Sequence, residues 1–282
     1  MGMDPYETIW ITGASGRMGR TLTSFLSRRK FTVFSTDREI NIAELDTVTD
    51  FASRNRPAIV INCAGISRKD QAEENPIEAY RVNTLGARNL AIASESVGAT
   101  IVHLSTDDLF FSGDNKPVNE FDDTNPLSVY GKSKLAGEKF VRELNPRHVI
   151  VRSSWVYTDI PEDPIMRAIA DAKRGIRVQA ASNQFSSPTS AWSLVRLIGV
   201  ILRHHEYGVF HATTQGTCSR VEFLEKVFEE CGLDTSLIDP VESNHPYHIE
   251  LDNLMLKMTD IFTFPNWEED LQQFIDISGL RA

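Results

Sequence analysis

A tyrosine and a lysine four residues apart are the side chains best placed by type and spacing for acid–base chemistry. Tyr130 and Lys134 lie near the start of a predicted helix, so both side chains share one helix face. A free phenol has a pKa of about 10, and a neighbouring ammonium lowers that pKa toward the range of a useful acid. Because the same spacing is common on surface helices, the pair needs support from elsewhere in the chain.

Two hydroxyls after a predicted core strand give part of that support. Ser105 and Thr106 follow the strand predicted at residues 100–104. Ligands bind beyond the carboxyl ends of strands in parallel sheets, so a hydroxyl there can hold a substrate oxygen beside Tyr130.

A glycine-rich turn with the spacing GxxGxxG lies between a predicted strand and a predicted helix. Such glycines let the main chain approach a pyrophosphate, and the helix N-terminus supplies N–H groups for the phosphates. Asp37 ends the second predicted strand 18 residues after Gly19, where a carboxylate receives the hydroxyls of an adenosine ribose. The pattern predicts a dinucleotide site that uses Gly13, Ser15, Gly16, Arg17, Met18, Gly19, Asp37 and Arg38.

The charged residues beside this turn do not decide between NADPH and NADH. A carboxylate at position 37 repels a 2′-phosphate, whereas the guanidiniums of Arg17 and Arg38 attract one. We therefore expect either NADPH or NADH as the cofactor. For both arginines, a solvated surface position is an equally good interpretation.

The elements that must position these residues alternate between strands and helices. Apolar runs predict strands at 8–12, 31–34, 58–62, 100–104 and 148–152, with helical patterns at about 18–26, 77–97 and 129–144. Strands that are apolar on both faces indicate an α/β fold, a Rossmann-type doubly wound parallel sheet. We expect a dinucleotide-binding domain at 1–154, to which the chain returns at about 184–213. A smaller, mixed C-terminal substrate lobe would comprise residues 155–183 and 214–282.

Composition excludes several other classes of protein. The 282 residues carry 29 Lys and Arg against 39 Asp and Glu, a formal charge of −10, which argues against nucleic acid as a partner. The longest apolar run, residues 197–202, is too short to span a membrane, and the first residues show no secretory signal. Three cysteines without a CxxC pair indicate neither a disulfide framework nor a metal site. We expect a cytoplasmic protein.

With these motifs in place, the chain resembles the extended short-chain dehydrogenases/reductases and, more narrowly, the dTDP-4-dehydrorhamnose reductase family. The resemblance covers about residues 8 to 225. Besides the glycine turn, the matching stretches are INCAG at 61–65, KDQAE at 69–73, YRVN at 80–83 with NL at 89–90, STD at 105–107, YGKSK at 130–134 with GE at 137–138, VRSSWVY at 151–157, and NQ at 183–184 with PT at 188–189; the residues between these last two pairs depart from the family pattern.

The resemblance implies roles for the residues at matching positions. Thr106, Tyr130 and Lys134 match the catalytic set, and the spacing of 24 residues between Thr106 and Tyr130 favours Thr106 over Ser105 as the active hydroxyl. Lys134 would also bind the nicotinamide ribose. Further cofactor contacts implied by the resemblance are Asn41 and Ile42 at the adenine and Cys63, Ala64 and Gly65 between the phosphates and the nicotinamide.

The implied substrate residues are Thr106, Asp108, Tyr130 and Trp155. Trp155 matches an aromatic residue that packs on the sugar, and a buried core tryptophan is the alternative interpretation. Asp108 replaces a family aromatic, and the loop at 158–164 and His245 also depart from the family pattern. These changes add acid where a substrate diphosphate would lie, and like charges weaken its binding.

The resemblance implies an NAD(P)H-dependent reductase of the 4-keto group of a nucleotide-activated deoxysugar, with Tyr130 as the proton donor. The family often forms dimers, so a homodimer is one open form of assembly. Two alternatives stay open. One is a reductase or epimerase of another sugar nucleotide or carbonyl compound. The other is a non-catalytic NADP-binding regulatory subunit resembling that of methionine adenosyltransferase.

Overall fold

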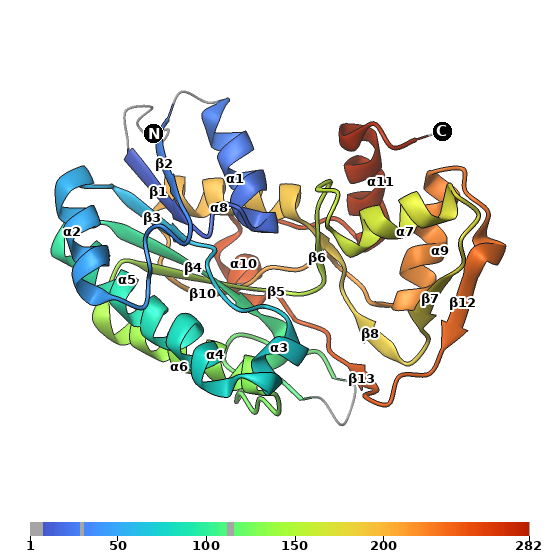
Figure 1. Cartoon of the computed structure of the whole chain (residues 1–282), viewed down its shortest axis with the longest axis horizontal. Helices are drawn as coiled ribbons and strands as arrows, with labels where there is room; N and C mark the ends of the chain where they lie inside the picture. The colour runs from blue at the N-terminus through green and yellow to red at the C-terminus, as the bar shows by residue number, and fades with distance from the viewer. Residues whose placement is uncertain (1–7, 29–30, 112–115, 282) are drawn as a thin grey trace. The chain divides into compact units, whose positions relative to one another are not determined.

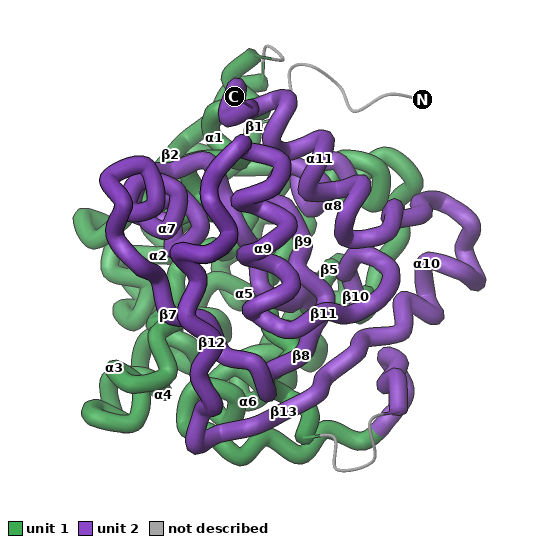
Figure 2. The backbone as a smooth tube through the Cα atoms, turned by 90° about the vertical axis from the view of Figure 1, so that its right-hand side faces the viewer, with its two compact units in different colours: residues 1–111, 123–152, 197–210 green, residues 112–122, 153–196, 211–282 purple. Residues whose placement is uncertain are grey.

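The computed structural model describes residues 8–28, 31–111 and 116–281 of the chain. The chain forms two compact units, coloured separately in Figure 2. Unit 1 comprises residues 1–111, 123–152 and 197–210, and unit 2 comprises residues 112–122, 153–196 and 211–282. The domain boundaries expected from the sequence stay a prediction.

A six-stranded sheet in the order β10-β5-β4-β3-β1-β2 forms the centre of unit 1. The strand β1 pairs in parallel with both β2 and β3, and β3 pairs in parallel with β4. The connections therefore reverse direction between β1 and β3, the point where open α/β sheets bind ligands. The strands are β1 Thr8–Thr12, β2 Thr32–Thr36, β3 Ile59–Asn62, β4 Thr100–Thr106, β5 His148–Ser153 and β10 Gly208–His211.

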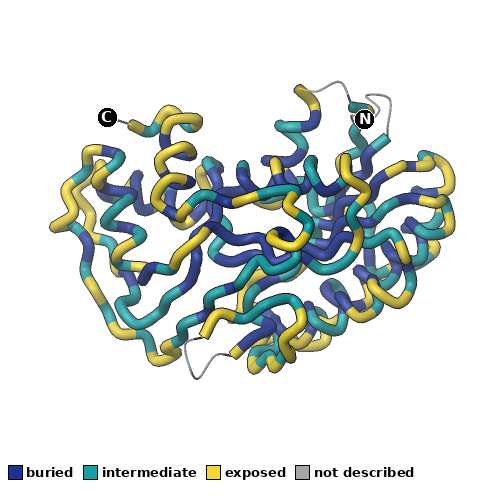
Figure 3. Tube along the Cα trace, turned by 180° about the vertical axis from the view of Figure 1, so that it is seen from behind, coloured by how far each residue is buried: buried dark blue, intermediate teal, exposed yellow. Residues whose placement is uncertain are grey.

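Helices cover both faces of this sheet (Figure 1), as the apolar strands require. The side chains of Ile9, Trp10 and Ile11 are all fully buried, and the strands form the dark centre of unit 1 in Figure 3. The predicted α/β fold is confirmed. The helices of unit 1 are α1 Arg17–Ser27, α2 Leu45–Asn55, α3 Lys69–Glu74, α4 Pro76–Tyr80, η1 Arg81–Gly86, α5 Ala87–Ser96, η2 Asp107–Leu109 and α6 Val129–Leu144, and α8 Ala191–His204 is shared with unit 2.

The helix predicted at 77–97 contains a π-helical segment, η1, between α4 and α5. The amide of Asn83, within this segment, bonds Ile66 through both its oxygen and its nitrogen and also reaches Ser133 on α6. Hydrophobic periodicity cannot show this segment, because the apolar pattern continues across it. Such π segments are frequent at functional sites.

Unit 2 is built from short strands and helices around its own apolar core. Tyr157 donates its hydroxyl to the buried carboxylate of Asp270, which also accepts the main-chain N–H of Ser190. No helix within the described ranges is both long and apolar enough to cross a bilayer. The elements are β6 Val156–Tyr157, α7 Pro164–Ala172, β7 Val178–Ala181, β8 Gln184–Ser186, β9 Thr189–Ser190, β11 Cys218–Ser219, α9 Arg220–Glu230, η3 Thr235–Leu237, β12 Ile238–Val241, β13 Tyr247–His248, α10 Leu254–Thr259 and α11 Trp267–Ser278.

A buried ion pair ties α6 to β5. Arg152 Nη2 lies 2.7 Å from Glu138 Oε2, and Arg152 Nε lies 3.1 Å from Glu138 Oε1. The two side chains are only 4% and 1% exposed, so each charge depends on the other. Loss of one partner leaves the other charge buried without compensation.

We expect Arg152→Met to lower the free energy of unfolding by about 3–5 kcal/mol, because Glu138 loses its counter-charge. Urea denaturation at pH 7 measures the loss. Arg54→Met is the matched control, because its partner Asp50 and Arg54 itself are both largely exposed. This control should lose less than about 1 kcal/mol. Equal losses in the two variants would contradict the role given to the buried pair.

Candidate functional site

The glycine turn after β1 leaves no room for side chains. Gly13 has a φ of +63°, and a Cβ atom on it would lie 2.6 Å from the main chain of Ala64. A Cβ on Gly19 would collide with the carbonyl of Gly13. The turn therefore needs glycine at both positions, and it keeps the main chain at the start of α1 bare, as a pyrophosphate requires.

Asp37 lies directly after β2 and faces this turn. Its carboxylate accepts the main-chain N–H of Ser15 at 2.9 Å and also the Ser15 hydroxyl. The structure thus brings the predicted acid and the predicted turn together. Arg38 is exposed. Arg20, which sequence reasoning missed, donates its Nε to the carbonyl of Ser15 at 2.7 Å.

The predicted adenine residues lie beyond Asp37 in the chain. Ile42 is 6% exposed, and its carbonyl accepts the side-chain amide of Asn89 at 3.0 Å. The amide of Asn41 bonds Glu44 at 2.7 Å. These bonds fix the main chain after β2, while a nucleotide contact of either residue stays a prediction.

Thr106 and Tyr130 are brought together by the end of β4 and the start of α6. The Thr106 hydroxyl donates to the Asp107 carboxylate at 3.2 Å and accepts the main-chain N–H of Asp108 at 3.2 Å, and it lies near enough to the Tyr130 phenol to influence its pKa. Desolvation raises the pKa of Tyr130 to about 12, with Asp107 and Asp108 acting in the same direction. The Thr106 side chain and the charge of Arg17 act in the opposite direction. The phenol therefore keeps its proton at neutral pH.

The charge of Lys134 does not act on Tyr130 as the sequence predicted. We expected its ammonium to lower the pKa of Tyr130, but its Nζ donates to the carbonyl of Leu104 on β4 instead. Burial lowers the pKa of Lys134 to about 8, against the opposing effects of Glu138 and Cys63. The amine and the ammonium are therefore both accessible near neutral pH.

Cys63 follows β3 beside this lysine. Burial raises the pKa of its thiol to about 12, so the thiol is protonated and not a nucleophile. Its main-chain N–H donates to the carbonyl of Thr12 at 3.1 Å. The next residue, Ala64, donates its N–H to the side chain of Asn62 at 3.1 Å. The segment at 63–65 is thus held against the glycine turn, while its contact with a nucleotide stays a prediction.

Asp108 helps to fix the first turn of α6, and its negative charge is paired with Lys69. Its carboxylate forms an ion pair with Lys69 and accepts the hydroxyl of Ser128. Ser128 in turn caps α6 by accepting the N–H of Gly131 at 2.9 Å. The acid that we expected to repel a substrate diphosphate is therefore paired with a lysine, and it helps to fix the helix turn that carries Tyr130.

Three buried polar residues of unit 1 complete the site and were not singled out from the sequence. Asn83 bonds Ser133 at 2.9 Å and so orients α6. His103 contacts Lys134, and Asn62 contacts His103; the two side chains are 1% and 2% exposed, respectively. For Asn62 and His103, a polar side chain inside an otherwise apolar strand pattern was the available sign of this role, because a buried polar group needs a partner; Asn83 lies in η1, outside any strand.

Trp155 lies in unit 2 and is half-buried rather than part of a core. Its φ of +38° is a strained conformation for a tryptophan, of a kind that clusters at functional sites. Its indole N–H donates to the Tyr247 hydroxyl at 2.9 Å, and the Arg220 guanidinium lies 4.0 Å from its ring centroid. Tyr247 and Arg220 were missed from the sequence.

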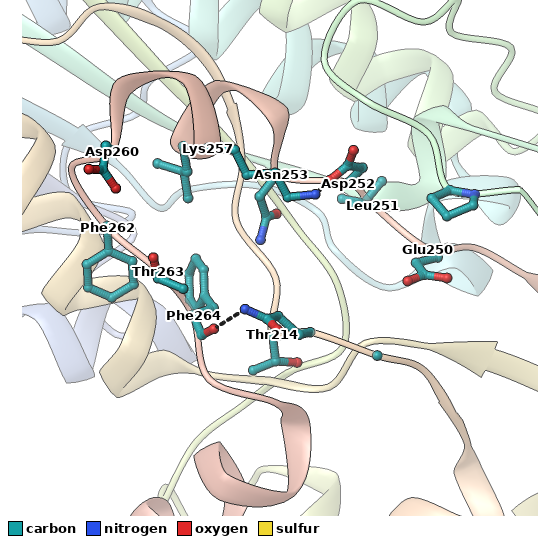
Figure 4. A pocket seen from close by; sticks show the side chains of 14 residues that line it. Thr214, Glu250, Leu251, Asp252, Asn253, Lys257, Asp260, Phe262, Thr263 and Phe264 are labelled. Carbon is teal, nitrogen blue, oxygen red and sulfur yellow. Dashed lines mark hydrogen bonds and ion pairs between the residues drawn. The ribbon is translucent and has the colours of Figure 1, made fainter.

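Unit 2 also contains a cavity of about 390 Å³ along α10, shown in Figure 4. Its lining includes Asp252, Asn253 and Lys257 together with Phe262 and Phe264. None of the predicted site residues lines it, so this cavity is separate from the cluster around Tyr130.

The similarity to known proteins agrees with this geometry. The RmlD substrate binding domain family matches residues 7–279. The chain belongs to this family. It is 33% identical to the dTDP-4-dehydrorhamnose reductase of Mycolicibacterium smegmatis, over 95% of this chain and 85% of that protein. It is 34% identical to the spore coat polysaccharide biosynthesis protein SpsK of Bacillus subtilis, over 82% of this chain and 81% of that protein.

A solved structure shows the same fold with a nucleotide. The dTDP-4-dehydrorhamnose reductase of Bacillus anthracis in complex with NADP has a TM-score of 0.92, with 31% identity, over 96% of this chain and 99% of that chain. The family resemblance inferred from the sequence is confirmed.

We expect Lys134→Met to change how stability depends on pH. The pKa of Lys134 is about 8 in the folded chain against an ordinary value of 10.5, so between these pH values the unfolded chain binds more protons. The unfolding free energy of the wild type should rise by about 3 kcal/mol relative to the variant between pH 8 and 10.5. Urea denaturation across this range measures the difference. Lys132→Met, on an exposed position of the same helix, should run parallel to the wild type. A difference between wild type and Lys134→Met that is independent of pH would contradict the lowered pKa.

Proposed function

We propose that this chain reduces the 4-keto group of a nucleotide-activated deoxysugar of the dTDP-4-dehydrorhamnose type, with NADPH or NADH as the reductant. The observation that carries the proposal is the placement of the Thr106 hydroxyl at the end of β4 near the Tyr130 phenol, on the helix that also carries the buried Lys134. Membership of the RmlD substrate-binding domain family supports the substrate class, and the NADP complex of the Bacillus anthracis relative supports the cofactor class.

The residues around the glycine turn suit a dinucleotide. Gly13 and Gly19 leave the main chain bare, and a side chain on either would collide with its surroundings. The Asp37 carboxylate would receive the adenosine ribose, in exchange for its bonds to Ser15. When bound, a reduced nicotinamide supplies the hydride that the ketone carbon accepts.

The proton for the ketone oxygen comes from Tyr130. Its raised pKa keeps the phenol protonated until negative charge develops on that oxygen, which makes proton transfer favourable at that moment. Thr106 lies near the phenol and donates its hydroxyl to Asp107 in the free chain; turned to the substrate oxygen instead, the same O–H would hold that oxygen at the acid. Positive charge that favours the phenolate left behind comes from Arg17, while Lys134 is fixed on the carbonyl of Leu104.

The sugar-binding role of Trp155 is part of the same proposal. Its ring is held by Tyr247 and Arg220 in a strained backbone conformation, so its orientation is set before a substrate arrives. The cytoplasmic location and a homodimer stay predictions.

We expect Tyr130→Phe to lower the rate of NADPH oxidation with dTDP-4-dehydrorhamnose by about 10²–10⁴-fold, the usual contribution of a positioned acid. Absorbance at 340 nm follows the reaction. Tyr80→Phe is the control, because Tyr80 is an exposed tyrosine of unit 1, and its rate should match the wild type. An unchanged rate in Tyr130→Phe, or no oxidation by the wild type at high enzyme concentration, would reject the proposal.

Asp37→Ala should shift the cofactor preference toward NADPH, because the carboxylate that repels a 2′-phosphate is gone. We expect the ratio of kcat/KM with NADPH to kcat/KM with NADH to rise about tenfold, from about 1.4 kcal/mol of removed repulsion. Asp50→Ala, an exposed acid on α2, should leave the ratio unchanged. A ratio that stays constant or falls in Asp37→Ala would show that this carboxylate does not face the ribose.

A further inference from the structure

A chain of buried polar side chains runs from β1 across the sheet to Lys134. Thr12 Oγ1 donates to Asn62 Oδ1 at 3.0 Å, and Asn62 Nδ2 lies 3.0 Å from His103 Nδ1. On the other side of the ring, His103 Nε2 lies 3.4 Å from Lys134 Nζ. All four residues belong to unit 1 and are at most 6% exposed.

The direction of these hydrogen bonds follows from the main chain. The N–H of Ala64 lies 3.1 Å from Asn62 Oδ1 and can only donate, so this amide atom must be the oxygen. The NH₂ group of Asn62 therefore faces His103, and Nδ1 of the ring must accept. Burial and the charge of Lys134 keep the pKa of His103 well below 6.5, so the ring is neutral. A neutral ring that accepts at Nδ1 carries its proton on Nε2.

The Nε2 proton is therefore directed at the amino group of Lys134. An amine can accept it with its lone pair, whereas an ammonium has no lone pair and would face another N–H. Two other titratable groups act on Lys134. Glu138, one turn further along α6, favours the ammonium, and the protonated thiol of Cys63 lies beside it. The carbonyl of Leu104 accepts a hydrogen bond from either form of the lysine.

We propose that Asn62 and His103 are positioning residues of Lys134, which fix the imidazole proton on Nε2 and present it to the lysine amine. The proposal rests on the proposed function only in taking Lys134 as a member of the catalytic set. Its consequence is that two side chains outside the Thr106, Tyr130 and Lys134 set contribute, together with burial and Glu138, to the pH at which the lysine loses its charge.

The tautomer can be observed without substrate or cofactor. In the full-length protein labelled with ¹⁵N-histidine, long-range ¹H–¹⁵N spectra distinguish the two tautomers and the imidazolium, and loss of one signal set in His103→Phe assigns the ring. We expect the Nε2–H tautomer from pH 6 to pH 9. An Nδ1–H tautomer or an imidazolium would overturn the proposal. Thr12→Val is the control, because Ala64 still holds the amide of Asn62, and the tautomer should not change.

A substitution in Asn62 tests the effect on the lysine. In Asn62→Asp the carboxylate accepts from Nδ1, so the proton moves to that nitrogen and Nε2 becomes an acceptor for the ammonium. We expect the pKa of Lys134 to rise by about 1 to 3 pH units, measured from the ¹³Cε shift of labelled lysine, with Lys134→Met as the assignment. An unchanged Lys134 pKa would contradict the proposal.

The new carboxylate also acts on Lys134 through space, and a double variant separates the two effects. In Asn62→Asp/His103→Phe the imidazole is absent, so the substitution at position 62 can no longer act on Lys134 through a change of tautomer. Most of the rise in the Lys134 pKa should therefore disappear. A rise in the Lys134 pKa of equal size in the double variant would overturn the proposal that Asn62 acts on Lys134 through His103. If the wild type shows the expected tautomer but reduces no keto sugar, the relay stands and the proposed function fails.

Discussion

The attachment of α6 to the sheet is the constraint on which the rest of the site depends. At its first turn, Glu73 accepts the N–H of Val129, and Ser128 caps the helix while it bonds Asp108. Further along, Glu138 binds Arg152 on β5. Because Tyr130 and Lys134 lie between these attachments, small movements of the helix are opposed at both ends. Precise placement of catalytic groups depends on such support from neighbouring residues.

Burial at this helix face changes the pKa values of Tyr130 and Lys134, the two side chains proposed for catalysis, in opposite directions. Desolvation raises the pKa of the phenol of Tyr130 and lowers that of the amine of Lys134, because in each case it disfavours the charged form. The phenol therefore holds its proton firmly, and the lysine can exchange its proton near neutral pH. Opposite shifts in neighbouring groups are a mark of acid–base sites.

The fold could be predicted, and the candidate site could be located, because their patterns are local. Apolar strands flanked by helices predict the sheet, and the spacings of the glycine turn and of Tyr130 with Lys134 are short-range. The relay through Asn62 and His103 could not be predicted, since it joins residues of different strands through buried hydrogen bonds. The lowered pKa of Lys134 was missed for the same reason, because burial is a property of the packed chain.

A residue that departs from the family pattern does not by itself show how the substitution affects the site. Asp108 differs from the family aromatic, and the sequence alone indicated unwanted negative charge. In the folded chain, Lys69 supplies the opposite charge from α3, and Ser128 uses the carboxylate to fix the start of α6. A substituted residue thus keeps the site intact because a distant residue compensates it. The effect of a substitution on a site therefore depends on the residues that contact it in the folded chain. For His245 and the loop at 158–164, these contacts lie in unit 2.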